Sequence, residues 1–264
     1  MSTLACRDLS VSFGGVKALT ELGLEVDRGQ LVALIGPNGA GKTTSIDALT
    51  GFVPATGAIE LDGRNITAAS PHERAQRGLA RTWQSIMLFD DLTVRENLVV
   101  AAQRPAAIEI AKELLGRPVR RSASVDTALD RLGLLDVADA MPSELSQGRR
   151  KLVGVARALV GDPHVVCLDE PAAGLDTWES RQLGAQLRAI ADGGTGILLV
   201  DHDMGLVLAI SDRVIVLEFG RVIAQGPPEE IRADSRVIEA YLGATAASEV
   251  ASELDASAAG SDLP

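Results

Sequence analysis

One stretch of the sequence decides the fold: Gly36-Pro37-Asn38-Gly39-Ala40-Gly41-Lys42-Thr43. It follows an apolar run, Leu31–Ile35, and precedes a segment of helical character, Thr44–Leu49. Glycines let the backbone curl so that several N–H groups point at one anion, and the start of a helix adds partial positive charge. The pattern G-x-x-x-x-G-K-[ST] between a strand and a helix therefore predicts a phosphate-binding loop.

Two side chains of this loop suit the phosphates of a nucleotide. Lys42 is expected to neutralise the β- and γ-phosphates, and the Thr43 hydroxyl is expected to bind Mg²⁺. A glycine-rich turn that binds nothing is the alternative, but the strand before it and the helix after it favour the phosphate-binding loop. The loop alone does not distinguish kinases, GTPases and ATPases, and the sequence contains no Asn-Lys-x-Asp motif for guanine.

Composition narrows the class of protein. The 264 residues are 46% hydrophobic and 23% charged, which suits one large α/β domain or two small ones. The net charge of −11 argues against binding nucleic acid through a basic face. With two cysteines there is no disulfide framework, and Cys167 lies in an apolar run and is predicted to be buried. No apolar run exceeds five residues, so we expect no membrane-spanning segment.

Apolar runs alternate with helical periodicity, which predicts a mostly parallel α/β sheet. Besides Leu31–Ile35, the runs are Val165–Leu168, Ile197–Val200 and Val214–Leu217. From about residue 90 to about residue 155, Ala- and Leu-rich helical segments replace the strand candidates, and we predict a helical insertion there. We place one folded domain at residues 1–243. Residues 244–264 are mainly Ala, Ser and acidic residues, which predicts a disordered tail.

The run Val165–Leu168 ends in two carboxylates, Asp169 and Glu170. The carboxyl ends of parallel strands share one edge of a sheet, so both side chains are expected near the phosphate-binding loop. There Asp169 can hold Mg²⁺, and Glu170 can polarise a water for in-line attack on the γ-phosphate. The alternative is that they cap a turn before Pro171, but the phosphate-binding loop favours the catalytic interpretation.

A further motif, Leu145-Ser146-Gln147-Gly148-Arg149, stands 23 residues before Asp169 and opens an amphipathic helix over Arg150–Val160. Ser146 is expected to cap this helix, Gly148 to allow close approach, and the free N–H groups to face an anion. The motif resembles the Leu-Ser-Gly-Gly-Gln signature of ATP-binding cassette (ABC) ATPases. Gln147 replaces the first glycine of that signature, and Arg149 replaces its glutamine.

The resemblance to ABC ATPases extends from about residue 4 to 243. Four further residues match the family's motifs in order: Phe13 the adenine-stacking aromatic, Gln84 the Q-loop, Asp176 the D-loop and His202 the switch histidine. The resemblance implies the fold of a P-loop NTPase (RecA-like), with a mostly parallel sheet core, an antiparallel β region and an inserted helical subdomain.

The same resemblance implies ATP and Mg²⁺ as ligands and assigns residues to each. Mg²⁺ would be held by Thr43, Gln84 and Asp169, and catalysis would rest on Glu170, His202 and Gln84. The nucleotide would be contacted by Phe13, Gly36, Pro37, Asn38, Gly39, Ala40, Gly41, Lys42, Thr43, Thr44, Ser146, Gly148 and Asp176.

Three stretches resemble the larger ATPase subunit of branched-chain amino acid importers: Gly78–Asn97, Asp201–Arg213 and Phe219–Gly243. The resemblance implies a head-to-tail pair with a second, non-identical ATPase, in which each ATP lies between one phosphate-binding loop and the partner's signature helix. A pair of identical chains is the alternative in isolation. Transmembrane permease subunits would contact the insertion and the Q-loop at the cytoplasmic face of the membrane, and a periplasmic or extracellular solute-binding protein would act through them.

Other functions stay open at this stage. One is a related importer for urea or short amides, because the solute never touches this subunit. Another is a soluble ABC ATPase acting on ribosomes or DNA, which the single cassette, the short insertion and the negative charge disfavour. A third is an inactive regulatory cassette, which the presence of Lys42, Asp169, Glu170 and His202 disfavours.

Overall fold

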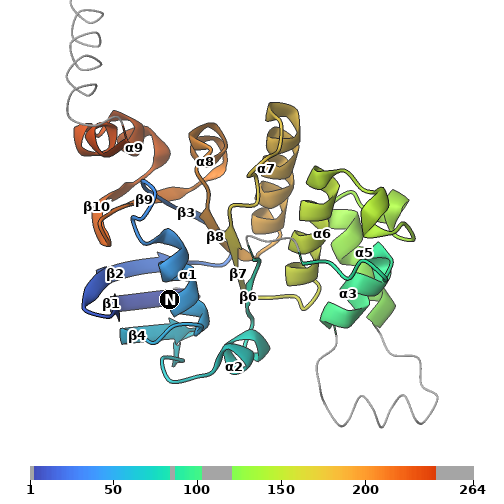
Figure 1. Cartoon of the computed structure of the whole chain (residues 1–264), viewed down its shortest axis with the longest axis horizontal. Coiled ribbons are helices and arrows are strands. Elements are labelled where there is room, and N and C mark those ends of the chain that lie inside the picture. Colours follow the sequence, from blue (N-terminus) through green and yellow to red (C-terminus); the bar gives the residue numbers. More distant parts are fainter. Residues whose placement is uncertain (1–2, 84–86, 103–120, 242–264) are drawn as a thin grey trace, which may run out of the picture.

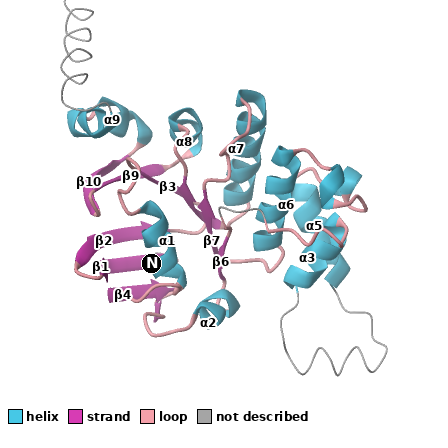
Figure 2. Ribbon diagram, in the orientation of Figure 1, coloured by secondary structure: helices cyan, strands magenta, loops and turns pink. Residues whose placement is uncertain are grey.

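Two β-sheets form the body of the protein in the computed structural model, which describes residues 3–83, 87–102 and 121–241 (Figure 1 and Figure 2). The larger sheet has six strands, in the order β10 (Arg221–Gly226), β9 (Arg213–Glu218), β3 (Leu31–Ile35), β8 (Gly196–Val200), β7 (Val165–Asp169) and β6 (Leu79–Arg81). All its neighbouring strands are parallel except β10, which pairs antiparallel with β9. The predicted mostly parallel sheet is confirmed.

The smaller sheet is antiparallel and has four strands, in the order β2 (Val16–Val26), β1 (Leu4–Phe13), β4 (Thr56–Leu61) and β5 (Arg64–Asn65). It is the antiparallel region that the family resemblance implied. The pairing of β1 with β2 shifts register between Cys6 and Leu9 and again beyond, and Asp8 lies in the left-handed region with φ of 52°. Such bulges break the strict alternation of apolar and polar residues, so periodicity did not predict these strands individually.

Strand β3 is buried on both faces, and its alternate side chains enter two different cores. Leu31, Ala33 and Ile35 face one core. Val32 and Leu34 face the other, which they share with the antiparallel sheet and with helix α1 (Lys42–Thr50). Helix α1 accordingly lies between the two sheets (Figure 1). Coverage of both faces explains why the central strands are continuous apolar runs.

The core that contains Leu31 is covered by helices α7 (Thr177–Asp192), α8 (Met204–Ile210) and α9 (Pro228–Ala233). A short helix, α2 (Pro71–Gln76), precedes β6. The remaining helical segments are α3 (Val94–Ala102), α5 (Arg121–Arg131), α6 (Gln147–Leu159) and the 3-10 turns Leu135–Val137 and Pro142–Glu144.

Helices α3, α5 and α6 contact one another at one end of the molecule (Figure 1). The described residues between about 90 and 155 thus contain helices and no strand, as the sequence predicted. The boundaries of a separate subdomain stay a prediction, and residues 244–264 lie outside the described residues. Within the described ranges, no helix combines the length and apolar character needed to cross a membrane. Cys167 is buried, as predicted.

Candidate nucleotide-binding and hydrolysis site

The phosphate-binding loop joins the end of β3 to the start of α1, and its glycines are required by the backbone. Gly36, Gly39 and Gly41 have φ values of 151°, 81° and 103°. A Cβ atom on Gly36 would lie 2.1 Å from the carbonyl oxygen of Leu217, so only glycine fits there. The N-cap residue of α1 is Gly41, which has no side chain, so no N-cap side chain competes for the N–H groups of the first turn.

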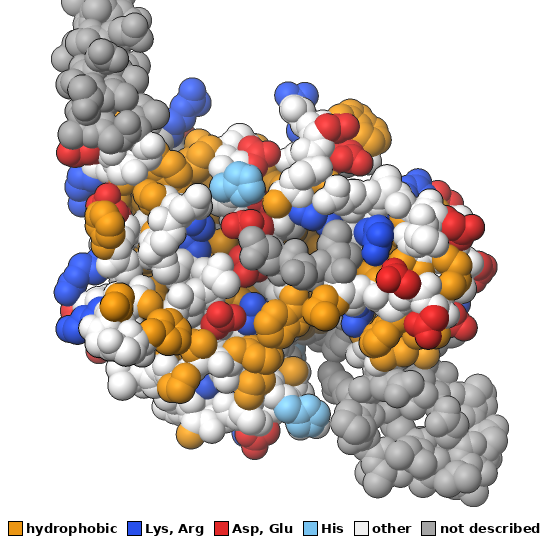
Figure 3. Space-filling view, in the orientation of Figure 1, with side chains coloured by type: hydrophobic (Ala, Val, Ile, Leu, Met, Phe, Trp, Pro, Cys, Tyr) orange, Lys and Arg blue, Asp and Glu red, His pale blue; other side chains and the backbone are white. Residues whose placement is uncertain are grey.

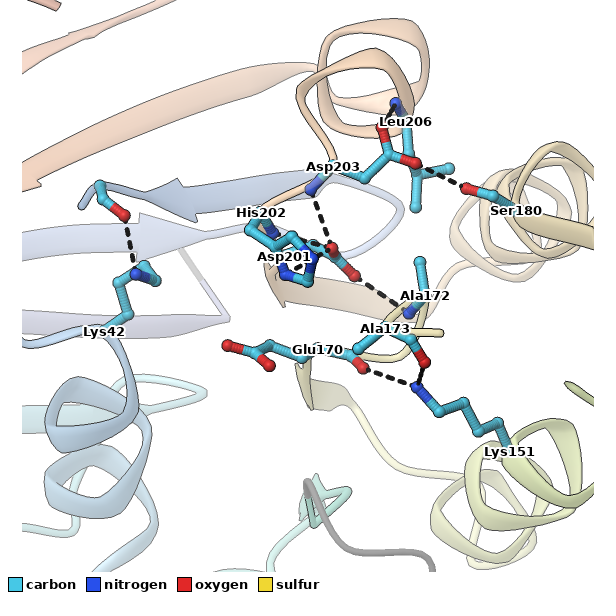
Figure 4. Close-up of polar contacts among 11 residues, drawn as sticks. Lys42, Lys151, Glu170, Ala172, Ala173, Ser180, Asp201, His202, Asp203 and Leu206 are labelled. Atoms are coloured by element: carbon cyan, nitrogen blue, oxygen red, sulfur yellow. Dashed lines mark hydrogen bonds and ion pairs between the residues drawn. The ribbon is translucent and has the colours of Figure 1, made fainter. Parts of the chain in front are cut away.

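Lys42 is buried at the first position of α1, and its ammonium group lies over the loop. Its Nζ donates hydrogen bonds to the carbonyl oxygens of Gly36 (2.7 Å) and Pro37 (3.1 Å). Burial lowers the pKa of Lys42, while the carboxylates of Glu170 and Asp169 oppose that shift. The side chain of Glu170 extends toward the Lys42 side of the site (Figure 4). The loop therefore has a cation next to two acidic groups.

Asp169 ends β7 and is only 2% exposed. Its backbone N–H donates to the hydroxyl of Thr82 at 3.1 Å, but its side-chain Oδ1 has no hydrogen-bond partner. Burial, and then the nearby charge of Glu170, raise the pKa of Asp169 to about 6. A buried carboxylate oxygen without a partner fits a Mg²⁺ ligand. Among the described residues no three His, Cys, Asp or Glu side chains gather as a metal site, so Asp169 would need ligands of other kinds, such as the Thr43 hydroxyl and phosphate oxygens.

Glu170 follows Asp169 and has a left-handed backbone, with φ of 49°. Such a conformation costs about 1–3 kcal/mol for a residue other than glycine, and it persists where its surroundings determine it. Here the backbone N–H of Glu170 donates to the carbonyl of Val200 at 2.7 Å, which ties it to the end of β8. The sharp turn directs the side chain away from the strand and toward the phosphate-binding loop (Figure 4).

His202 lies just beyond the end of β8, and its side chain is 62% exposed. The residue before it, Asp201, is completely buried. The Oδ1 atom of Asp201 accepts hydrogen bonds from the backbone N–H groups of His202 (2.8 Å) and Asp203 (3.0 Å). His202 was predicted from the sequence as a site residue, and Asp201 was not. A signal was present, because Asp201 directly follows an apolar run, as Asp169 does.

The signature segment begins α6 at the protein surface. Ser146 caps the helix and accepts from the backbone N–H of Arg149 at 3.3 Å, as predicted. The helix begins at Gln147, three residues before the predicted start at Arg150, because the capping serine is its true boundary. A Cβ atom on Gly148 would lie 2.6 Å from Oε1 of Glu179, so this glycine makes room for α7 of the same chain.

One residue of the signature and the predicted D-loop residue have clear partners. Arg149, which replaces the family's glutamine, pairs with Asp136 at 2.8 Å. Asp176, the predicted D-loop residue, caps α7 and accepts from the backbone N–H groups of Trp178 and Glu179, both at 2.8 Å. The cap explains why an aspartate suits this position whatever else it contacts.

Strands β3, β8 and β7 are neighbours and parallel, so their carboxyl ends meet at one edge. This edge gathers the phosphate-binding loop, His202 and the pair Asp169 and Glu170, as the sequence predicted. Phe13 ends β1 and is 49% exposed, which leaves ring surface for a ligand. Gln84 lies outside the described residues.

Comparison with known proteins agrees with this geometry. Residues 19–173 match the family model described as ABC transporter, and residues 221–247 match the one described as branched-chain amino acid ATP-binding cassette transporter. The chain belongs to the ABC transporter ATP-binding family. As a member it binds and hydrolyses ATP, and it works with the permease subunits of a membrane transporter.

Individual relatives are similar over nearly their whole length. The chain is 41% identical over 248 residues to the high-affinity branched-chain amino acid transport ATP-binding protein LivG of Salmonella typhimurium, covering 91% of this chain and 97% of LivG. It is 37% identical over 248 residues to BraF of Pseudomonas aeruginosa, which carries the same description, with the same coverage. Among solved structures, the ADP conformation of an ATP-binding cassette of an ABC transporter matches with a TM-score of 0.82 and 29% identity, covering 92% of this chain and 99% of that one. These findings confirm the predicted family and fold.

Proposed function

We propose that this chain is the ATP-hydrolysing subunit of a membrane importer for branched-chain or other hydrophobic amino acids. The observation that carries the substrate class is the match of residues 221–247 to the branched-chain family model, a segment outside the general ABC match at 19–173. Similarity to LivG and BraF over 91% of the chain supports it. An importer for urea or short amides is the alternative.

The residues at the sheet edge take distinct roles in the proposed reaction. Lys42 and the N–H groups of the loop hold the β- and γ-phosphates, and Phe13 stacks on the adenine. Thr43 and Asp169 hold Mg²⁺, with Gln84 as a further ligand. When bound, this ion neutralises charge that develops on the phosphates. Glu170 accepts a proton from the attacking water, and the exposed ring of His202 contacts the γ-phosphate.

A second ATPase subunit completes each site in this proposal. Ser146 is exposed at the start of α6, so the free N–H groups of that helix can receive phosphates held by the partner's loop. Gly148 is buried in the first turn of α6 and Asp176 is exposed at the start of α7, and we assign both residues to the same contact. We propose a non-identical partner, as in the importers that the sequence resembles, and a pair of identical chains as the form in isolation.

The permease subunits are proposed to bind the apolar side chains of a cleft between β6, β7 and α6, and not the carboxylates of Asp169 and Glu170, which line the same cleft. The cleft has a volume of about 690 Å³, and its apolar side chains include Trp83, Met87 and Phe89, whose exposed fractions are 52%, 73% and 43%. Hydrophobic side chains also gather at the centre of the face drawn in Figure 3. Exposed apolar surface of this kind favours a protein partner. Binding there would hold the chain at the cytoplasmic face of the membrane, and a solute-binding protein would act only through the permease.

Glu170→Gln tests the catalytic assignment. The amide keeps size and hydrogen bonding but removes the base, which typically costs about 10²–10⁴ in rate. ATP binding should survive, so the ATP-filled pair should accumulate, as measured by size-exclusion chromatography with light scattering alongside phosphate release. Mutating Ser146 should instead impair hydrolysis at the partner's loop. Near-normal hydrolysis by Glu170→Gln, or no association in ATP, would overturn these roles.

The substrate class needs a separate measurement. The chain, its partner ATPase, the permease subunits and the solute-binding protein encoded beside them are reconstituted in proteoliposomes. Leucine, isoleucine or valine should stimulate ATP hydrolysis and be taken up, whereas urea and acetamide should not. Uptake of urea or acetamide without uptake of leucine would establish the alternative importer, and Glu170→Gln serves as the inactive control.

A further inference from the structure

We propose that Asp201 is a positioning residue for ATP hydrolysis: its buried carboxylate joins the turn after Glu170 to the turn that carries His202. The inference rests on the proposed roles of Glu170 and His202, and it names the side chain that holds these two residues in position relative to each other. Asp201 does not itself reach the nucleotide in this account. Figure 4 shows the two turns on either side of its side chain.

Each oxygen of the Asp201 carboxylate serves a different turn. Oδ2 accepts from the backbone N–H of Ala172 at 3.0 Å, two residues after Glu170. Oδ1 accepts from the N–H groups of His202 at 2.8 Å and Asp203 at 3.0 Å. Asp201 is 0% exposed, so water does not compete for these bonds. This side chain therefore adds a second link between the two turns, beside the backbone bond from Glu170 to Val200.

Lys151, in the second turn of α6, holds the same turn from the opposite side. Its Nζ donates to the carbonyl oxygens of Glu170 (3.4 Å) and Ala173. Burial lowers the pKa of Lys151, and the carboxylates of Asp201 and Glu170 oppose that shift. The turn that begins at Glu170 is thus held by a cation from the signature helix and by the carboxylate that follows β8.

The network continues to the helix that Asp176 caps. Asp203 follows the switch histidine and caps α8. Its Oδ1 accepts a hydrogen bond from the backbone N–H of Leu206. Its Oδ2 accepts from the hydroxyl of Ser180 in α7 at 2.9 Å. Hydrogen bonds therefore run from the signature helix through the turn of Glu170 to the switch histidine and on to α7 (Figure 4). A movement of α6 or α7 against the partner cassette would therefore shift the turns that carry Glu170 and His202.

The chemistry of this position calls for a carboxylate. Three backbone N–H donors converge on Asp201, and an ionised carboxylate accepts hydrogen bonds at both oxygens and has no donor. An asparagine keeps one acceptor oxygen, and its NH₂ group would face an N–H donor. Asp201→Asn should therefore release one of the two turns. Displacing a catalytic group by about 1 Å can cost about 10² in rate.

The test compares Asp201→Asn and Asp201→Glu in the full chain assembled with its permease subunits. We expect Asp201→Asn to lower kcat about 10²-fold with little change in the KM for ATP, because the phosphates are held by the loop at Lys42. Asp201→Glu keeps two acceptor oxygens and should recover part of the lost kcat. The matched control is Asp212→Asn. Asp212 also accepts a hydrogen bond from a backbone N–H, that of Leu31 at 2.7 Å, but Leu31 begins β3 and lies at the end of that strand opposite the catalytic edge. A general loss of stability would lower the fraction of folded protein and so the apparent kcat without changing KM. The melting temperature of each variant is therefore measured, and kcat is expressed per ATP-binding site.

A combined variant separates this inference from the proposed function. If Asp201 acts through Glu170 and His202, adding Asp201→Asn to the variant Glu170→Gln with His202→Ala should make it no slower. Multiplying losses, or a normal kcat for Asp201→Asn, would overturn the inference while leaving Glu170 in its role. Normal hydrolysis by Glu170→Gln would instead overturn the proposed function. If Asp201→Asn does not fold, Lys151→Met takes its place in the test. We expect the same selective loss of kcat from Lys151→Met. An unchanged kcat would contradict the inference.

Discussion

The ammonium group of Lys42 donates a hydrogen bond of 2.7 Å to the carbonyl oxygen of Gly36, the first residue of its own loop. Lys42 stands six positions after Gly36, so this bond closes the loop between β3 and α1 into a ring through the lysine side chain. Lys42 is 8% exposed, and its stem packs inside the protein while its charge faces the loop. The lysine thus contributes to the shape of the loop as well as to its charge.

Replacing Lys42 separates these two contributions. Lys42→Ala removes both stem and charge, whereas Lys42→Met keeps the apolar stem and removes only the ammonium group. We expect both variants to lose most ATP binding and hydrolysis, since neither neutralises the phosphates. Isothermal titration with ATP and melting without ATP are the measurements. Tight ATP binding by Lys42→Met would contradict the assignment of the loop.

The buried carboxylate of Asp169 predicts a dependence of Mg²⁺ binding on pH. Its pKa is raised from 3.8 to about 6, so its contribution to the stability of the metal-free protein is present below about pH 4 and lost as pH rises through 6. Mg²⁺ needs the charged form, so its affinity should fall about tenfold for each pH unit below 6.

The measurement is the rise in melting temperature that Mg²⁺ produces with ATP at pH 5.5 and at pH 7.5. ATP itself titrates in this range, so Asp169→Asn is the matched control, because it retains the titration of ATP and lacks that of the carboxyl group. The rise in melting temperature that Mg²⁺ produces should increase from pH 5.5 to pH 7.5 by more in the wild-type chain than in Asp169→Asn. An identical pH dependence in both would show that Asp169 is not the titrating ligand.

A further prediction concerns the free energy of unfolding and Arg74, which lies away from the catalytic edge. It is 4% exposed and donates to four carbonyl oxygens, those of Ala48, Leu49, Thr67 and Ala69, at 2.7 to 2.9 Å. Two of these belong to the last turn of α1. Arg74→Lys cannot reach all four, and each buried carbonyl left without a partner costs about 1–3 kcal/mol.

We expect Arg74→Lys to lower the melting temperature by at least about 4 °C, since each kcal/mol corresponds to about 2–4 °C in a domain of this size. The control is Arg77→Lys, because Arg77 is exposed three residues further along. It should melt as the wild type does. Equal melting of the two variants would show that the hydrogen bonds of Arg74 contribute little to the free energy of unfolding.

Much of the fold could be predicted from local patterns. The apolar runs of β3, β7, β8 and β9 were identified to within a residue or two, because strands covered on both faces need continuous apolar sequence. The antiparallel sheet came only from the family resemblance, because bulges at positions such as Asp8 interrupt its alternation. The helix at Gln147 began earlier than its periodicity suggested, because a cap rather than an apolar residue sets its start.

The sequence by itself determined the phosphate-binding loop, the acidic ends of the strands and the cap at Ser146. These features depend on residues a few positions apart, whose spacing is fixed by the backbone of one turn or one strand. Only the tertiary structure decided the partners of Asp201, Lys151 and Arg74. Asp201 meets Ala172 across 29 residues, and Arg74 meets Ala48 across 26. Such contacts follow from the order in which strands and helices pack. A buried charge needs hydrogen-bond partners, but the residues next to it in the sequence do not indicate which distant groups those partners are.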